Sequence, residues 1–89
     1  SSFDPKYTAS SRQLCAAISR YYGFVKKRGG KGSHEKYEGD DFKGQRTVLT
    51  IPGRRESLSI GVIKHVVEAI CGKPDITLID QVLNGTFQK

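Results

Sequence analysis

GFVKKRGGKGSHEKY, residues 23–37, is the stretch around which the rest of the chain is organised. It alternates basic residues with glycines and places His34 directly after Gly32 and Ser33. Between Lys26 and Lys36, five side chains are basic and one is acidic, which gives +4 of the chain's net charge of +6. Such a basic cluster indicates an anionic partner, which is a nucleic acid, an acidic protein or an anionic membrane.

The whole chain has 89 residues, which predicts a single domain over 1–89. It contains no apolar run of the roughly 18–20 residues that a membrane span needs, and its start, SSFDPKYTASS, has no apolar leader region. We therefore expect no membrane association and a cytoplasmic location. Cys15 and Cys71 fall in separate expected helices and form no CxxC pair, which favours buried thiols, with a disulfide as the alternative. We expect neither a metal nor another cofactor.

Apolar residues at helical spacing predict three helices. The first covers about 11–22, with Ser10 and Gln13 as a capping box and Gly23 at its end. The second begins after Ser57 or Ser59, either of which can cap it, and its apolar stripe contains Ile63, Val66, Val67 and Ile70 before Gly72. A short third helix is capped by Asp75 and stops at Gly85, within a C-terminal extension over 75–89.

Three strands lie between the first two helices. They are expected at 24–27, 33–38 and 46–52, separated by glycine-containing turns, the second of which covers 39–44. The chain thus predicts an α+β fold, a two-layer sandwich in the order α-β-β-β-α with a three-stranded antiparallel sheet, a short C-terminal helix and a loose arm at 1–9. In the second strand, alternation puts Tyr37 on the core face, so His34 and Lys36 face away from the helices.

An exposed histidine among lysines suggests chemistry on a phosphate. Imidazole exchanges a proton near neutral pH, and RNA cleavage by its own 2′-OH needs a proton acceptor, cations and a proton donor. His34 could exchange the proton, cations could come from Arg28, Lys31 or Lys36, and the amides of Gly32 and Ser33 could approach the phosphate. The alternative is a solvated strand histidine among solvated lysines.

Arg54 and Arg55 form a second basic group. They precede the second helix, whose N-terminus could hold a phosphate with them. The alternative is a basic loop in water.

At these residues the sequence resembles the HicA family of small RNA-cleaving toxins of bacterial and archaeal toxin–antitoxin pairs. The resemblance covers 11–72 and rests on motifs in a fixed order, which are Gly23-Phe24-Val25, the basic stretch, Gly32-Ser33-His34, Tyr37, Val48–Pro52 and Leu58-Ser59-Ile60-Gly61. It implies a double-stranded-RNA-binding-domain-like fold, cleavage of mRNA with His34 as the essential residue, and a HicB-like antitoxin that covers the site. Many members have a second histidine after the strand-closing proline, where this chain has Gly53-Arg54-Arg55.

The leading prediction is therefore a metal-independent endoribonuclease toxin. Its catalytic residue is His34, and its RNA-binding residues are Lys26, Lys27, Arg28, Lys31, Gly32, Ser33, Lys36, Arg54 and Arg55. Two alternatives remain open, a non-catalytic RNA-binding module of the double-stranded-RNA type and a basic adaptor for an acidic protein.

Overall fold

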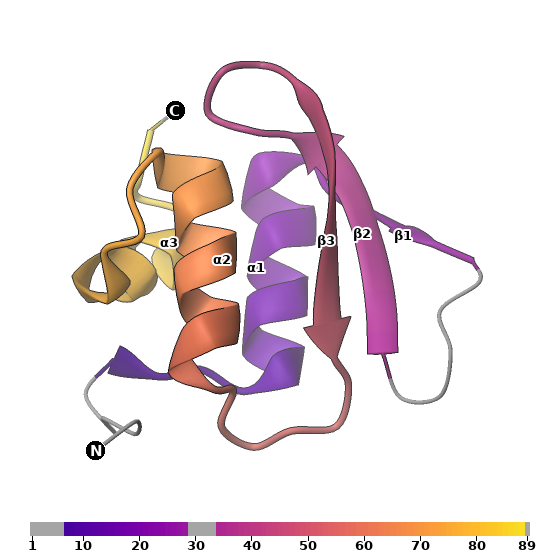
Figure 1. Ribbon diagram of the computed structural model, residues 1–89, viewed down its shortest axis with the longest axis vertical. Coiled ribbons are helices and arrows are strands. Elements are labelled where there is room, and N and C mark those ends of the chain that lie inside the picture. The colour runs from indigo at the N-terminus through magenta and orange to yellow at the C-terminus, as the bar shows by residue number, and fades with distance from the viewer. Residues whose placement is uncertain (1–6, 29–33, 89) are drawn as a thin grey trace.

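The computed structural model describes residues 7–28 and 34–88. Of the predicted features, most of the N-terminal arm and the residues Lys31, Gly32 and Ser33 lie outside these ranges. The described elements follow in the order α1 (Ser11–Tyr22), β1 (Val25–Lys27), β2 (His34–Asp40), β3 (Arg46–Pro52), α2 (Ile60–Cys71), the 3-10 helix η2 (Ile76–Leu78) and α3 (Ile79–Asn84) (Figure 1). The α+β class and the predicted element order are confirmed.

The capping box of α1 is present. The Gln13 amide donates to Ser10 Oγ at 3.1 Å, and the Ser10 amide donates to Gln13 Oε1 at 3.0 Å. Gly23 ends the helix at φ 72°, a left-handed conformation that glycine adopts without strain. The predicted helix bounds, 11–22, are confirmed.

The three strands form one antiparallel sheet in the order β1-β2-β3. Two predicted strand bounds were wrong. Phe24 does not belong to β1 but lies buried beneath the sheet, and β2 continues through Gly39 and Asp40, which had been assigned to the turn. The reason is tertiary, because the ring of Phe24 packs on Gly39 and Asp40 pairs with Arg46 on β3. The turn begins only at Asp41.

The two C-terminal helices end at the predicted glycines, and α2 starts after one of its two predicted caps, whereas α3 starts later than predicted. Ser59, not Ser57, caps α2, and Gly72 ends it at φ 87°. Asp75 caps the 3-10 helix η2, so α3 begins only at Ile79 and is shorter than a helix started by Asp75. The Tyr22 hydroxyl donates to the carbonyl oxygens of Phe87, at 3.2 Å, and Gln81, which ties this extension to α1.

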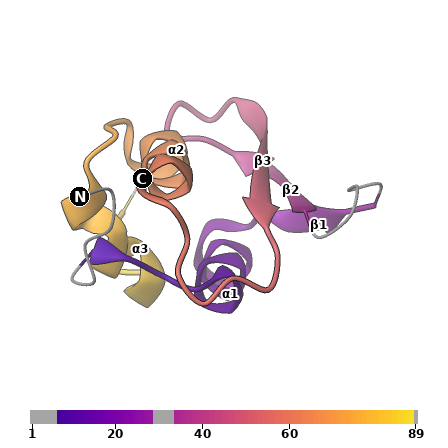
Figure 2. The same cartoon turned by 60° about the horizontal axis from the view of Figure 1, so that its bottom comes forward.

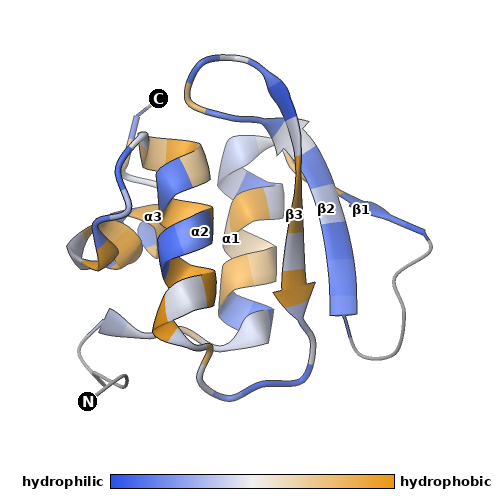
Figure 3. Ribbon diagram, viewed as in Figure 1, coloured by the Kyte–Doolittle hydropathy of each residue, from blue (hydrophilic) through white to orange (hydrophobic). Residues whose placement is uncertain are grey.

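Both long helices, α1 and α2, cover the same face of the sheet, and α3 packs against them on the side away from the sheet (Figures 1 and 2). The apolar faces of the helices meet Tyr37 of β2 and Leu49 and Ile51 of β3 in one core. The other face of the sheet has no covering layer in the part of the chain that is described, and Val25 and Val48 are 60% and 45% exposed on it. Hydrophilic residues follow β2 along its length (Figure 3).

Within residues 7–28 and 34–88, no helix combines the length and the apolar character that crossing a membrane requires.

Candidate functional site

His34 is the first residue of β2 and is exposed to solvent. Its partner in register is Pro52, the last residue of β3, so it lies at the end of the sheet where β3 leads into the following loop. Tyr37 is only 7% exposed and faces the helices. By alternation, His34 and Lys36 share the opposite, open face, which is the placement that the sequence predicts.

Lys36 stands in the middle of the open face. It pairs with Lys27 on β1 and with Thr50 on β3. Residues directly opposite in an antiparallel sheet have Cβ atoms about 5 Å apart, where like charges destabilise each other. Glu38 neutralises the charge of Lys27 in an ion pair, with 3.2 Å between Glu38 Oε1 and Lys27 Nζ. No ion pair to Lys36 occurs among the described side chains. An anion bound beside Lys36 would remove the repulsion.

Acidic residues on the open face lie away from His34. Glu38 and Asp40 occupy the end of β2 near the turn, where Arg46 contacts them at 3.8 and 3.4 Å. At the other end, the strand positions of this face hold Lys27, His34, Lys36, Thr50 and Pro52, none of which is acidic. The described part of this face therefore has a mixed-charge half and a basic half, and His34 belongs to the basic half.

The predicted basic residues do not all meet at His34. Lys26 pairs with Tyr37 in register and so faces the helix layer, where its Nζ lies 3.0 Å from Glu35 Oε1. Arg28 is exposed directly after β1. Alternation thus divides the basic stretch, with Lys27 on the face of His34 and Lys26 on the other.

Arg54 and Arg55 lie in the loop between β3 and α2, which is hydrogen-bonded to the start of α1. The Arg55 amide donates to Ser11 Oγ at 3.0 Å, and its carbonyl accepts from the Ser11 amide at 2.9 Å. Ser11, which is 3% exposed, also donates through its hydroxyl to the Pro52 carbonyl. These hydrogen bonds hold the loop against the first turn of α1, and α2 begins at Ile60, so the shared phosphate site at its N-terminus stays a prediction.

A pocket of about 670 Å³ is formed where this loop meets α1 and β2. Arg12, Arg54 and Arg55 line it together with Glu35 and Tyr37. No local sequence signal identifies Arg12 as a site residue, because only the tertiary hydrogen bonds of the loop bring it near the other arginines.

Two weakly acidic groups in this pocket stay protonated near neutral pH. Burial raises the pKa of the Cys15 thiol, and burial together with the neighbouring thiol and Glu35 raises the pKa of Tyr37 far above its ordinary value. The Tyr37 hydroxyl donates to Glu35 Oε1 at 3.5 Å. These groups serve as hydrogen-bonding partners and not as proton acceptors in a reaction.

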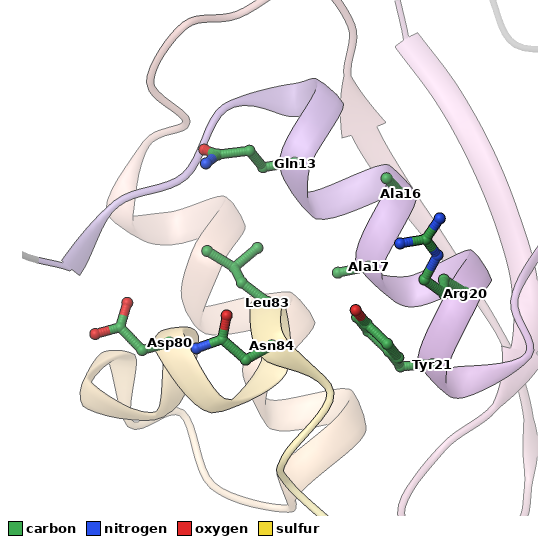
Figure 4. A pocket seen from close by; sticks show the side chains of 8 residues that line it. All are labelled: Gln13, Ala16, Ala17, Arg20, Tyr21, Asp80, Leu83 and Asn84. Carbon is green, nitrogen blue, oxygen red and sulfur yellow. The ribbon is translucent and has the colours of Figure 1, made fainter.

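The remaining candidates lie elsewhere. His65 is exposed on α2, in the helix layer, so it cannot reach the open face that carries His34. Cys15 and Cys71 are free thiols. A second pocket, of about 380 Å³, lies between α1 and α3 and is lined by Ala16, Arg20 and Tyr21 among others (Figure 4).

Comparisons with known proteins do not extend this picture. No family model, no curated protein and no solved structure matches the chain. Among the described residues, no three His, Cys, Asp or Glu side chains are grouped so that they could hold a metal ion. The function has to be inferred from the side chains and their geometry.

Proposed function

We propose that this chain is a HicA-like toxin, a metal-independent endoribonuclease that cleaves mRNA on the open face of a double-stranded-RNA-binding-domain-like fold. The observation that carries the proposal is the exposed His34 in the basic half of that face, two residues from Lys36, which lies opposite Lys27. An imidazole next to cations on an uncovered surface supplies both the proton transfer and the charge stabilisation that the reaction needs.

In the proposed reaction, the 2′-OH of one nucleotide attacks the adjoining phosphorus in line. The 2′-oxygen forms a bond to phosphorus as it loses its proton, and the bond from phosphorus to the 5′-oxygen of the next nucleotide breaks as that oxygen gains a proton. The products are a 2′,3′-cyclic phosphate and a 5′-OH. His34 makes one of these proton transfers, and Lys36 stabilises the additional negative charge on the phosphate oxygens. The predicted contribution of the Gly32 and Ser33 amides concerns residues outside the described ranges.

One observation favours the alternative, an RNA-binding module that does not cleave. Among the described residues, His34 is the only histidine on the open face, and Arg54 stands in the region where many HicA-like chains have a second histidine. Binding through phosphate contacts needs no acid–base pair. The two functions share the same basic surface and differ in whether the RNA remains intact.

The proposed partner is a HicB-like antitoxin with an acidic surface. The basic half of the open face offers charge complementarity to it. Val25 and Val48, which lie on either side of Glu38 in register, add an apolar contact to the same face. Such a partner would cover His34 and prevent RNA from reaching it.

Expression without an antitoxin tests the proposal. We expect the wild-type chain and the His65→Ala variant to arrest growth and deplete mRNA, whereas His34→Ala does neither. His65 is the matched control because it is an exposed histidine in the helix layer. Equal arrest by His34→Ala and the wild type would remove His34 from the mechanism. RNA that stays intact with the wild-type chain, but is bound in a salt-dependent manner, would select the binding module instead.

A further inference from the structure

The arginine-lined pocket beside α1 is distinct from the surface around His34. Arg12, Arg54 and Arg55 reach it from two segments, and none of them forms an ion pair with another side chain in the described ranges. Its volume of about 670 Å³ is typical of pockets that bind small ligands. Arginine forks match the oxygen atoms of a phosphate, so the lining suits a phosphate-containing group.

Arg54 adds a conformational observation. Its φ is 60°, a left-handed backbone that residues other than glycine seldom adopt. Backbone outliers of this kind concentrate at ligand-binding and active sites, where the surrounding structure holds them in place. Here the hydrogen bonds of Arg55 to Ser11 fix the adjoining residue.

The pocket also contains hydrogen-bond acceptors. Glu35 forms an ion pair with Lys26 and accepts a hydrogen bond from the Tyr37 hydroxyl. Glu56, at the exposed rim, has neither an ion pair nor a side-chain hydrogen bond among the described side chains. A carboxylate accepts hydrogen bonds from the exocyclic amino group of a nucleobase. The side chains of an acidic peptide offer only acceptors, and the two glutamates would repel their charge. The combination of three arginines with a carboxylate therefore fits a nucleotide better than an acidic peptide.

The position of the pocket relates it to the proposed cleavage site. His34 and Glu35 are neighbours in β2 that point to opposite faces. Pro52, the partner of His34, is connected to Arg54 through Gly53 alone. An RNA strand that passes His34 and continues around this end of the sheet reaches the pocket next.

We propose that the Arg12–Arg54–Arg55 pocket binds the nucleotide adjoining the cleaved phosphate in single-stranded RNA. The arginines hold its phosphate and Glu56 accepts from the amino group of its base, so adenine, cytosine and guanine are preferred over uracil at that position. This inference rests on the proposed RNA-cleaving function.

Two charge-matched variants of α1 test the pocket. Arg12→Gln removes a pocket arginine, and Arg20→Gln removes an arginine of the same helix that lines the α1–α3 pocket instead (Figure 4). The probe is a short single-stranded RNA with 2′-O-methyl groups, which cannot be cleaved, and its affinity is measured by fluorescence anisotropy at several salt concentrations. We expect Arg12→Gln to weaken binding about tenfold and to reduce the slope of log K against log salt by about 0.7, and Arg20→Gln to change neither. Equal affinities of the two variants would overturn the proposal.

The same experiment separates this inference from the proposed function. His34→Ala is expected to cleave no unmodified RNA at any RNA concentration, whereas Arg12→Gln is expected to need about tenfold more RNA for half-maximal cleavage. RNA left intact by the wild-type chain removes the cleaving function, cleavage by His34→Ala removes His34 from the mechanism, and unchanged binding by Arg12→Gln removes the pocket. An oligoglutamate peptide should not displace the probe, and Arg12-dependent displacement would assign the pocket to an acidic protein. Discrimination against uracil that survives Glu56→Ala would refute the proposed base contact.

Discussion

Gly39→Ala provides a direct test of how the sheet packs on the core. Gly39 lies in β2 on the helix side, and a methyl group there would be 2.7 Å from Cγ and 2.9 Å from both Cδ atoms of Phe24. Carbon atoms pack best at about 3.5–4.0 Å, and Phe24 is buried, so its ring has no open space to move into. Overpacking of this kind costs about 1–3 kcal/mol, offset by about 0.4–1 kcal/mol from the stiffer unfolded chain.

The expected net loss of stability is about 1–2 kcal/mol, which for a domain of this size lowers the Tm by roughly 5–15 °C. Gly61→Ala is the matched control. Gly61 lies in the first turn of α2, and the nearest atom to an added methyl is Ser59 Oγ at 3.9 Å. Because alanine favours helix and restricts the unfolded chain, this variant is expected to gain about 0.4–1 kcal/mol. Thermal and urea unfolding followed by circular dichroism measure both changes.

A Gly39→Ala protein as stable as the wild type would refute the proposed packing of Phe24. A second variant sharpens the test. Phe24→Leu shortens the side chain that the new methyl meets, so the double variant should be more stable than the two single changes predict when added. RNA binding should be unaffected in folded Gly39→Ala protein, because Gly39 faces away from the open surface.

Three further outcomes are expected. Lys36→Gln should lower the slope of log K against log salt for RNA binding by about 0.7, without loss of stability, because it also removes the repulsion from Lys27. The control, Lys64→Gln on α2, should change neither the salt slope nor the stability. Equal salt slopes for the two variants would count against RNA binding on the open face. Tyr22→Phe should lower the free energy of unfolding by about 1 kcal/mol through loss of its bonds to the C-terminal extension, and unchanged urea unfolding would contradict this. Burial, and to a smaller extent the charge of Asp75, raises the pKa of the Cys71 thiol from 9.0 to about 11. At neutral pH the reactive thiolate is therefore about 100-fold rarer than in an unperturbed thiol, and alkylation of Cys71 by iodoacetamide should be slower by the same factor. Because the folded state favours the protonated thiol, the free energy of unfolding should be constant below about pH 9 with respect to this group and should decline as the pH rises towards 11.

Local signals were sufficient for the first helix and for the orientation of the second strand. Ser10 with Gln13 specifies the start of α1 within four residues of chain, and Gly23 specifies its end, so no distant contact is needed. The face of His34 follows from period-two alternation once Tyr37 is assigned to the core. These features depend on neighbours in sequence, which is why they were predicted correctly.

Features that depend on distant residues were not predictable in this way. Gly39 and Asp40 have poor intrinsic strand preference, yet both are in β2 because Phe24 packs on one and Arg46 pairs with the other. The same limit applies to Arg12, since only the hydrogen bonds of the loop to the start of α1 reveal which arginines it meets. Whether these arginines and His34 act on RNA stays a prediction that the proposed experiments test.

The Ser11 hydrogen bonds have a consequence for when the arginine pocket can exist during synthesis and folding. They join Ser11 to Pro52 and Arg55, which are 41 and 44 positions further along the chain. Closing so long a loop is opposed by chain entropy until most of the domain is in place. A nascent chain that has not reached Arg55 therefore lacks the pocket, and tight RNA binding should emerge only late, with the completed domain.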